Sequence, residues 1–262
     1  MDFITGNKFK QNCHYVYDEN GFIVQSQPSR GEILKVFVKI DYVHNFFTKP
    51  PLRPFILFTH NGDLPIDDSY LKYLDNINFL KWYGQNVMTI HSKLQSIPIG
   101  IANNQWDHGN EHDFIEIINE NNVKNNLFYI NFEITNFARN DCLQKLSTFG
   151  LYKQERKSFK EYLRELSKSY FVISPEGNGI DCHKTWEALY LKSIPIVTKS
   201  INIEFYKDLP IIIINDWSEF EPSNFDIDLY NRIWGTFDKN KISFKEQINS
   251  YHDLYLGRLK NI

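Results

Sequence analysis

The stretch from Tyr170 to Val197 places a strand, a glycine-containing loop, a helix and a second strand in immediate succession. The predicted strands are residues 170–173 and 194–197, and the helix spans about 181–192. Two strands joined through a helix are typical of a parallel sheet, because the crossover returns the chain to the edge where it began. This stretch therefore predicts an α/β fold.

The rest of the chain extends the same pattern. Strands predominate before residue 110, and strands alternate with helices after residue 125. Alternation of this kind predicts parallel sheets with helices on their faces, in two small α/β halves with a boundary between residues 110 and 125. The further predicted strands are 15–17, 22–24, 35–40, 55–59, 79–83, 97–101, 127–132 and 211–214. The further predicted helices are 69–75, 111–121, 141–149, 158–168, a short one near Asn202, and 243–258.

Composition excludes several classes of protein. Of 262 residues, 42% are hydrophobic and 16% aromatic, which is enough for a sizeable core. Lys and Arg total 29 against 32 Asp and Glu, so a general nucleic-acid binder is not expected. No run approaches the roughly 18 apolar residues of a membrane span, and the three cysteines form no C-x-x-C pair. We expect a soluble protein of the cytoplasm, or of the host cytoplasm if the source is a virus.

The loop between the strand at 170–173 and the following helix has the composition of an anion site. Gly177 and Gly179 allow the backbone to approach a ligand closely, and the start of the helix presents free N–H groups. Asp181 is a suitable N-cap for that helix. The alternative is an ordinary strand-to-helix turn, which also favours glycine.

Helical spacing assigns two faces to the predicted helix. One is a core stripe, listed here: Cys182, Trp186, Leu189 and Tyr190. His183 and Glu187 lie four residues apart on another face. There, His183 and Lys184 would contact phosphate oxygens, and the Glu187 carboxylate would accept hydrogen bonds from ribose hydroxyls. The alternative is a solvated helix face.

The segment SPEGNGIDCHKTWEALYLKSIPIV closely resembles the C-terminal signature of exostosin-like glycosyltransferases, G-N-G-x-D-x-H-[RK]-x-W-E-A-L followed by an apolar strand. The segments FILFTHNGDLPI, LKWYGQNV and IPIGIANNQWDHGN are similar to parts of related proteins. The resemblance implies a GT-B-like architecture, in which two Rossmann-like domains face a cleft. Residues 1–115 would form a reduced acceptor-side domain, and residues 116–262 would bind the nucleotide sugar.

The resemblance also implies roles for individual residues. Glu187 matches the ribose-binding glutamate of the family, and Lys184 stands where the family often has arginine, keeping the charge but losing the bidentate fork. Compared with animal exostosins, the chain is short, and we expect no signal anchor. The residues that match the loop and helix start around the phosphates are Asn178, Gly179, Asp181, His183 and Lys184.

Two residues outside this segment are further candidates on the donor side. Arg139 follows the strand at 127–132, where a basic residue can stabilise a departing diphosphate; a solvent-facing arginine is equally compatible. Glu176 immediately precedes Gly177 and would either contact the donor sugar or cap the helix.

The first half supplies candidates for the acceptor side. His60 and Asp63 follow the strand at 55–59, and either would serve as general base toward an acceptor hydroxyl. An Asn-Gly turn with an aspartate cap is the alternative. Trp106 would stack on a sugar ring or pack, partly buried, between the domains.

The function predicted from these residues is transfer of a sugar from a nucleotide sugar, with UDP as the expected nucleotide, to a glycan or other hydroxyl acceptor. The alternative is a non-catalytic module that retains nucleotide-sugar binding. A nicotinamide dehydrogenase is disfavoured, because no G-x-G-x-x-G follows an early strand. Asp226 and Asp228 form a D-x-D in a late acidic segment, and no cofactor or metal is expected.

Overall fold

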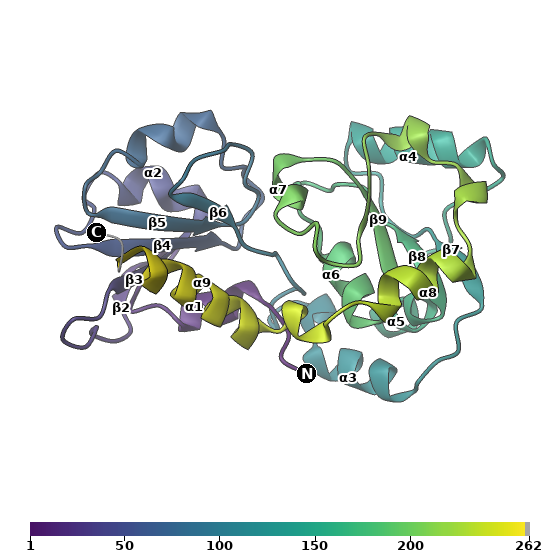
Figure 1. The fold of residues 1–262 in the computed structure, drawn as a ribbon, viewed down its shortest axis with the longest axis horizontal. Helices are drawn as coiled ribbons and strands as arrows, with labels where there is room; N and C mark the ends of the chain where they lie inside the picture. The colour runs from purple at the N-terminus through teal and green to yellow at the C-terminus, as the bar shows by residue number, and fades with distance from the viewer. Residues whose placement is uncertain (260–262) are drawn as a thin grey trace.

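The computed structural model describes residues 1–259, with side chains to residue 251, and has two α/β lobes (Figure 1). The sheet of the first lobe has the order β2-β1-β3-β4-β5-β6. Only β2 is antiparallel, because it forms the predicted hairpin with β1. Its strands are β1 (Tyr15–Asp18), β2 (Gly21–Val24), β3 (Leu34–Lys39), β4 (Phe55–His60), β5 (Phe79–Gly84) and β6 (Leu94–Ser96).

The sheet of the second lobe is entirely parallel and has the order β10-β9-β8-β7. Its central strands, β8 and β9, are apolar and almost fully buried, as expected for a sheet covered on both faces. The predicted α/β class, with parallel sheets flanked by helices, is confirmed. The four strands are β7 (Asn126–Tyr129), β8 (Ser169–Ile173), β9 (Ile194–Thr198) and β10 (Ile212–Ile214).

Local capping explains where several helices begin. Asn136 accepts a hydrogen bond from the Arg139 backbone, so α4 begins before the predicted residue 141. Ser158 and Glu161 form a capping box at α5. The α-helices are α1 (Gly6–Gln11), α2 (Val43–Phe46), α3 (Glu111–Asn119), α4 (Phe137–Ser147), α5 (Phe159–Ser167), α6 (His183–Tyr190), α7 (Ile201–Glu204), α8 (Ile227–Gly235) and α9 (Phe244–Leu259). The 3-10 helices are η1 (Ile40–Tyr42), η2 (Asp68–Tyr73), η3 (Asp107–Gly109), η4 (Trp217–Glu219), η5 (Pro222–Asn224) and η6 (Lys239–Ile242).

The predicted strand at 97–101 is wrong. The strand that pairs with β5 is β6, which ends at Ser96. Pro98 lacks a backbone N–H, and Gly100 has a φ of +66°, so the chain leaves the sheet at this point. Ile99 and Ile101 are nevertheless buried, and this explains why the segment resembles a strand.

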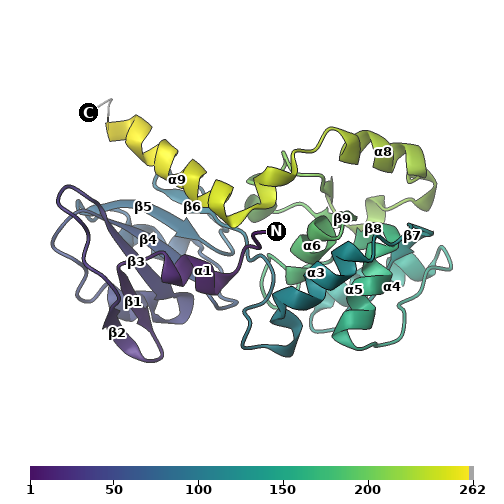
Figure 2. The same ribbon diagram turned by 90° about the horizontal axis from the view of Figure 1, so that it is seen from below.

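Helices α9 and α3 each contact a lobe that their position in the sequence does not predict. Helix α9 returns from the second lobe and lies along the first sheet (Figures 1 and 2), where the Tyr83 hydroxyl donates to the Tyr251 carbonyl at 3.0 Å. Helix α3, which spans the predicted boundary at 115, packs on α5 of the second lobe through Phe114 and Phe159. The second lobe is therefore inserted between two parts of the chain that contact the first sheet.

A buried tyrosine joins the two lobes where the chain passes between them. Tyr190 of α6 is 2% exposed; its hydroxyl accepts from the backbone N–H of Ile4 at 2.8 Å and donates to the Ile242 carbonyl at 2.9 Å. The backbone N–H of Ile101 donates to the Ile4 carbonyl at 2.9 Å. No helix among the described residues is long and apolar enough to cross a membrane.

Candidate functional site

Asp181 connects the carboxyl edges of the two sheets. Its backbone N–H donates to the side-chain oxygen of Asn86, which follows β5, at 2.9 Å. Its carboxylate accepts from the backbone N–H of Ile99 at 2.7 Å and from the indole of Trp186 at 2.9 Å. The predicted N-cap role of Asp181 is wrong, because α6 begins at His183 and its N-cap is Cys182.

A second set of contacts lies beside the first. Asn202, which is fully buried, accepts from the backbone N–H of Val87 at 3.1 Å and from the Ser96 hydroxyl at 2.6 Å. Ser96 also hydrogen-bonds the Tyr206 hydroxyl at 2.8 Å. Residues at or just after the ends of β5 and β6 thus contact residues that follow β8 and β9, and ligands of open α/β sheets bind at such carboxyl ends.

A cavity of about 320 Å³ lies at the carboxyl edge of the first sheet. It is bounded by the residues after β1, β3, β4 and β5, by the start of α1, and by the segment from 99 to 108. His183 is the residue of α6 that reaches it. Trp106 lines the cavity and is 57% exposed, so it does not pack partly buried between the lobes.

The two predicted catalytic residues have different surroundings in this cavity. His60 is buried, its Nε2 hydrogen-bonds the Pro98 carbonyl at 3.2 Å, and its Nδ1 accepts from the Asn61 backbone at 2.7 Å. Burial lowers the pKa of His60 to about 4, so the ring is neutral at pH 7. Asp63 is exposed at the cavity. Of the two, Asp63 therefore has the accessible proton acceptor.

Two asparagines at this edge have left-handed backbone conformations. Asn61 follows β4 with a φ of 63°, and Asn86 follows β5 with a φ of 58°. Residues other than glycine adopt this region at a free-energy cost, and such residues cluster at functional sites. Both asparagines hold other groups: the Asn61 amide accepts from Asn103 at 2.9 Å, and the Asn86 amide donates to the Asp63 carbonyl at 3.2 Å. In the sequence, the Asn61-Gly62 dipeptide is typical of a turn with such a conformation.

Arg139 lies against the glycine-containing loop. Its Nε donates to the Glu176 carbonyl at 3.0 Å, and its Nη1 donates to the Glu133 carbonyl at 2.9 Å. Asn136 donates to the carbonyls of Glu176 and Gly177 at 3.2 and 2.5 Å. The structure therefore brings Arg139, Glu176 and Gly177 together, and Arg139 is half-buried rather than solvent-facing.

The two glycines of this loop are required for different contacts. A Cβ atom at Gly177 would lie 2.7 Å from the Nη2 atom of Arg139, and one at Gly179 would lie 2.7 Å from the Asn86 amide nitrogen. Gly177 therefore admits the arginine, whereas Gly179 admits the first lobe. Asn178 is exposed between them.

Glu187 is not on an open helix face. Its side chain is 4% exposed and accepts a hydrogen bond from the Tyr162 hydroxyl at 2.5 Å. Lys184 donates to the same hydroxyl at 3.0 Å, with its ammonium 4.4 Å from the centre of the tyrosine ring. Burial lowers the pKa of Lys184 to about 8. The expectation that Glu187 lies on an accessible face is wrong, and Tyr162 was missed because it lies in another helix.

His183 begins α6 at the cavity. Its Nδ1 hydrogen-bonds the Gly100 carbonyl at 2.8 Å, and burial lowers its pKa. This contact therefore holds the imidazole between the lobes. The Nε2 atom is the ring nitrogen that the contact does not use. The predicted core stripe is confirmed at Trp186, Leu189 and Tyr190, whereas Cys182 is only half-buried.

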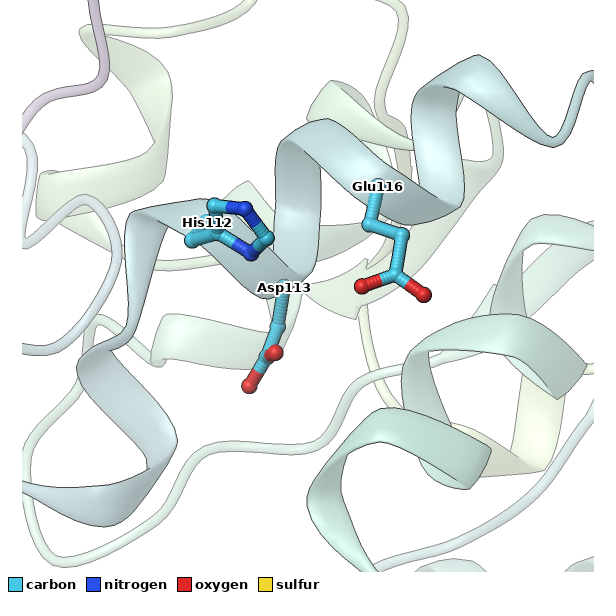
Figure 3. Close-up of side chains that lie close together, drawn as sticks. All are labelled: His112, Asp113 and Glu116. Carbon is cyan, nitrogen blue, oxygen red and sulfur yellow. The ribbon is translucent and has the colours of Figure 1, made fainter.

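Three possible metal ligands, His112, Asp113 and Glu116, lie close together on α3, with their ligand atoms within 4.8 Å of one another (Figure 3). Glu116 is already paired with Lys160 at 2.5 Å, so a cation there would compete with the lysine. At the D-x-D segment, Asp226 caps α8 by accepting from the Leu229 backbone at 2.7 Å. We therefore assign no metal site to either group of residues.

Comparison with protein families relates the second lobe to glycosyltransferases. Residues 110–223 match the family model described as the RXYLT1 C-terminal domain. The matched range includes all four strands of the second sheet and the predicted donor-side residues. The first sheet lies outside the match, as does the cavity lining apart from His183. A comparison with curated proteins gives no match.

Proposed function

We propose that this protein is a glycosyltransferase that moves a sugar from a nucleotide sugar, preferably a UDP-sugar, to a hydroxyl acceptor. The observation that carries the proposal is the placement of Arg139 against the Glu176–Gly177 loop, at the carboxyl edge of the sheet related to glycosyltransferases. The cavity that contains Asp63 belongs mainly to the first lobe, on the other side of the interface from this loop.

On the donor side, positive charge would bind the diphosphate. Arg139 and Lys184 would stabilise the negative charge that develops on the departing diphosphate as the bond to the sugar carbon breaks. A phosphate beside Lys184 or His183 raises the pKa of either group, since a nearby anion favours its protonated form. Glu187 would accept hydrogen bonds from the ribose once the ligand displaces Tyr162, whose hydroxyl covers the carboxylate in this structure. These interactions need no metal or cofactor.

On the acceptor side, Asp63 would take the proton of the attacking hydroxyl. A general base must lie within hydrogen-bond reach of that proton, and the two lobes would hold donor and acceptor in this relation. His60 would serve as a positioning residue, because its Nδ1 holds the backbone of Asn61.

Nucleotide binding tests the proposal. Parent protein should bind a UDP-sugar or UDP in calorimetry, and Arg139→Lys should weaken binding about tenfold, because lysine cannot reproduce the guanidinium fork. Arg156→Lys, an exposed arginine of the same lobe, is the matched control and should bind normally. Failure of every nucleotide sugar to bind would refute the proposal. Binding without hydrolysis or transfer would instead favour a non-catalytic nucleotide-sugar-binding module.

A further inference from the structure

The cavity of the first lobe is lined by amide side chains that hold one another in place. Asn7 donates to Gln105 at 2.9 Å, and Asn103 donates to Asn61 at 2.9 Å. The backbone N–H of Asn7 donates to Asn103 at 2.7 Å. These amides come from three separate segments of the chain. Their mutual hydrogen bonds orient polar groups before any ligand arrives, which reduces the entropic cost of binding.

The charged groups of the cavity do not favour an anion. Lys10 is paired with Asp18 at 2.5 Å, and Lys39 is paired with Glu19 at 3.3 Å. Asp63 adds a third carboxylate to the lining. Two lysines thus face three carboxylates, and each lysine already has a partner. Both lysines of this lining are thus already paired with carboxylates, so a phosphate or carboxylate on the ligand would have to compete for them.

Gln85 adds a buried hydrogen-bond acceptor that lacks a donor. Its side chain is 4% exposed and lines the cavity, and its Oε1 has no hydrogen-bond partner among the groups that the structure describes. Its backbone N–H donates to the Thr59 carbonyl at 3.0 Å, which fixes the residue at the end of β5. A buried acceptor without a donor costs free energy, and a ligand hydroxyl would supply the missing hydrogen. An anionic oxygen on the ligand would instead be repelled by the Gln85 oxygen.

Trp106 supplies an apolar surface at the same cavity. Its indole is 57% exposed, and its ring lies 6.3 Å from that of His108. An exposed aromatic face beside fixed amides suits a ligand that has both C–H and O–H groups on one ring.

We propose that this cavity is an acceptor subsite for an uncharged sugar ring, which would place its C–H face on Trp106 and donate a hydroxyl to Gln85. This inference rests on the proposed function in calling the site an acceptor subsite, since Asp63 would be the base there. The binding of a neutral sugar can be tested without any reaction.

Ligand-observed NMR and calorimetry test the subsite directly. Methyl glycosides of neutral hexoses and pentoses are titrated alone and with saturating UDP, beside glucuronate and sugar phosphates. At least one neutral glycoside should bind saturably. Its affinity should fall about tenfold in Trp106→Ala and in Gln85→Leu, which removes the acceptor oxygen at similar volume. Tyr152→Ala, an aromatic 69% exposed on the other lobe, should bind as the parent does.

The outcomes separate this inference from the proposed function. Nucleotide-sugar binding without binding of any neutral glycoside overturns the subsite and leaves the transferase proposal intact. Neutral-glycoside binding lost in Trp106→Ala, with no nucleotide sugar bound, supports the subsite and refutes the transferase. Preference for glucuronate or sugar phosphates, or binding unaffected by Trp106→Ala, overturns the subsite. Because Trp106 is exposed, its variant keeps the test valid if Gln85→Leu does not fold.

Discussion

The Asp181 carboxylate of the second lobe accepts a hydrogen bond of 2.7 Å from the backbone N–H of Ile99 in the first. The same carboxylate accepts from Trp186, so one buried side chain fixes both the start of α6 and the junction between the lobes. Any change at Asp181 therefore acts on the junction between the lobes as well as on stability.

Asp181 should make stability depend on pH. Burial raises its pKa to about 7, despite the hydrogen bonds from Ile99 and Trp186 that favour the ionised form. Between pH 4 and 7 the folded state keeps a proton that the unfolded state has lost, so the free energy of unfolding falls as pH rises. The slope from this group is at most about 1.4 kcal/mol per pH unit.

Denaturant unfolding of the parent and Asp181→Asn at a series of pH values measures this effect. Asparagine does not titrate, and it keeps only one acceptor oxygen for two donors. The destabilisation caused by Asp181→Asn should therefore shrink from pH 4 to 7 and stay constant above pH 8. A destabilisation that does not change above about pH 5 would mean that the native carboxylate is already ionised over this range.

Glu187→Gln should weaken nucleotide binding without disturbing the helix. Glutamine can still accept the Tyr162 hydrogen bond but loses the charge that would hold the ribose, at a cost of about 1.5–3 kcal/mol of binding free energy. Calorimetry with UDP gives the affinity. Tyr162→Phe is the control for the fold, since it breaks the same hydrogen bond from the other side. Unchanged affinity in Glu187→Gln would exclude the ribose contact.

His183→Ala and Trp186→Ala should have opposite effects. Trp186 is fully buried, and its removal should cost about 3–5 kcal/mol of stability through lost burial and an unfilled void. His183 lines the cavity, so its truncation should lower turnover and nucleotide affinity more than the melting temperature. Thermal melts and assays on both variants decide this. A His183→Ala variant that melts early but turns over normally would place His183 in the structural framework alone.

Transferase activity should survive treatment with EDTA. In the proposed mechanism Arg139 and Lys184 neutralise the diphosphate, so chelation removes nothing that the reaction needs. Assays before and after chelation, with manganese and magnesium added back, test this. Loss of activity that either ion restores would instead direct attention to His112, Asp113 and Glu116, or to Asp226 and Asp228.

The sequence was sufficient for features that depend on neighbours along the chain. Residues 170–197 fold as the predicted strand, loop, helix and strand, because buried apolar runs and the glycine-containing loop act locally. The segment 97–101 was mistaken for a strand since burial alone produces the same apolar pattern. There, Pro98 and Gly100 outweighed the pattern.

Contacts between elements could not be derived in this way. Helical periodicity places Glu187 on a face, but it does not reveal that Tyr162 of α5 covers that face. The role of Asp181 was likewise invisible, because its partner Ile99 is 82 residues away and belongs to the other lobe. Gln85 lies in the segment LKWYGQNV, which is similar to parts of related proteins, but its burial at the cavity without a hydrogen-bond donor could not be derived from the sequence.

The hydroxyl of Tyr190 has a mechanical consequence. The chain passes between the lobes twice, and this one oxygen binds Ile242 at the second crossing and Ile4, which pairs with Ile101 ahead of the first. Tyr190 therefore joins the second lobe to both segments through a single oxygen, and loss of its hydroxyl would release both contacts together.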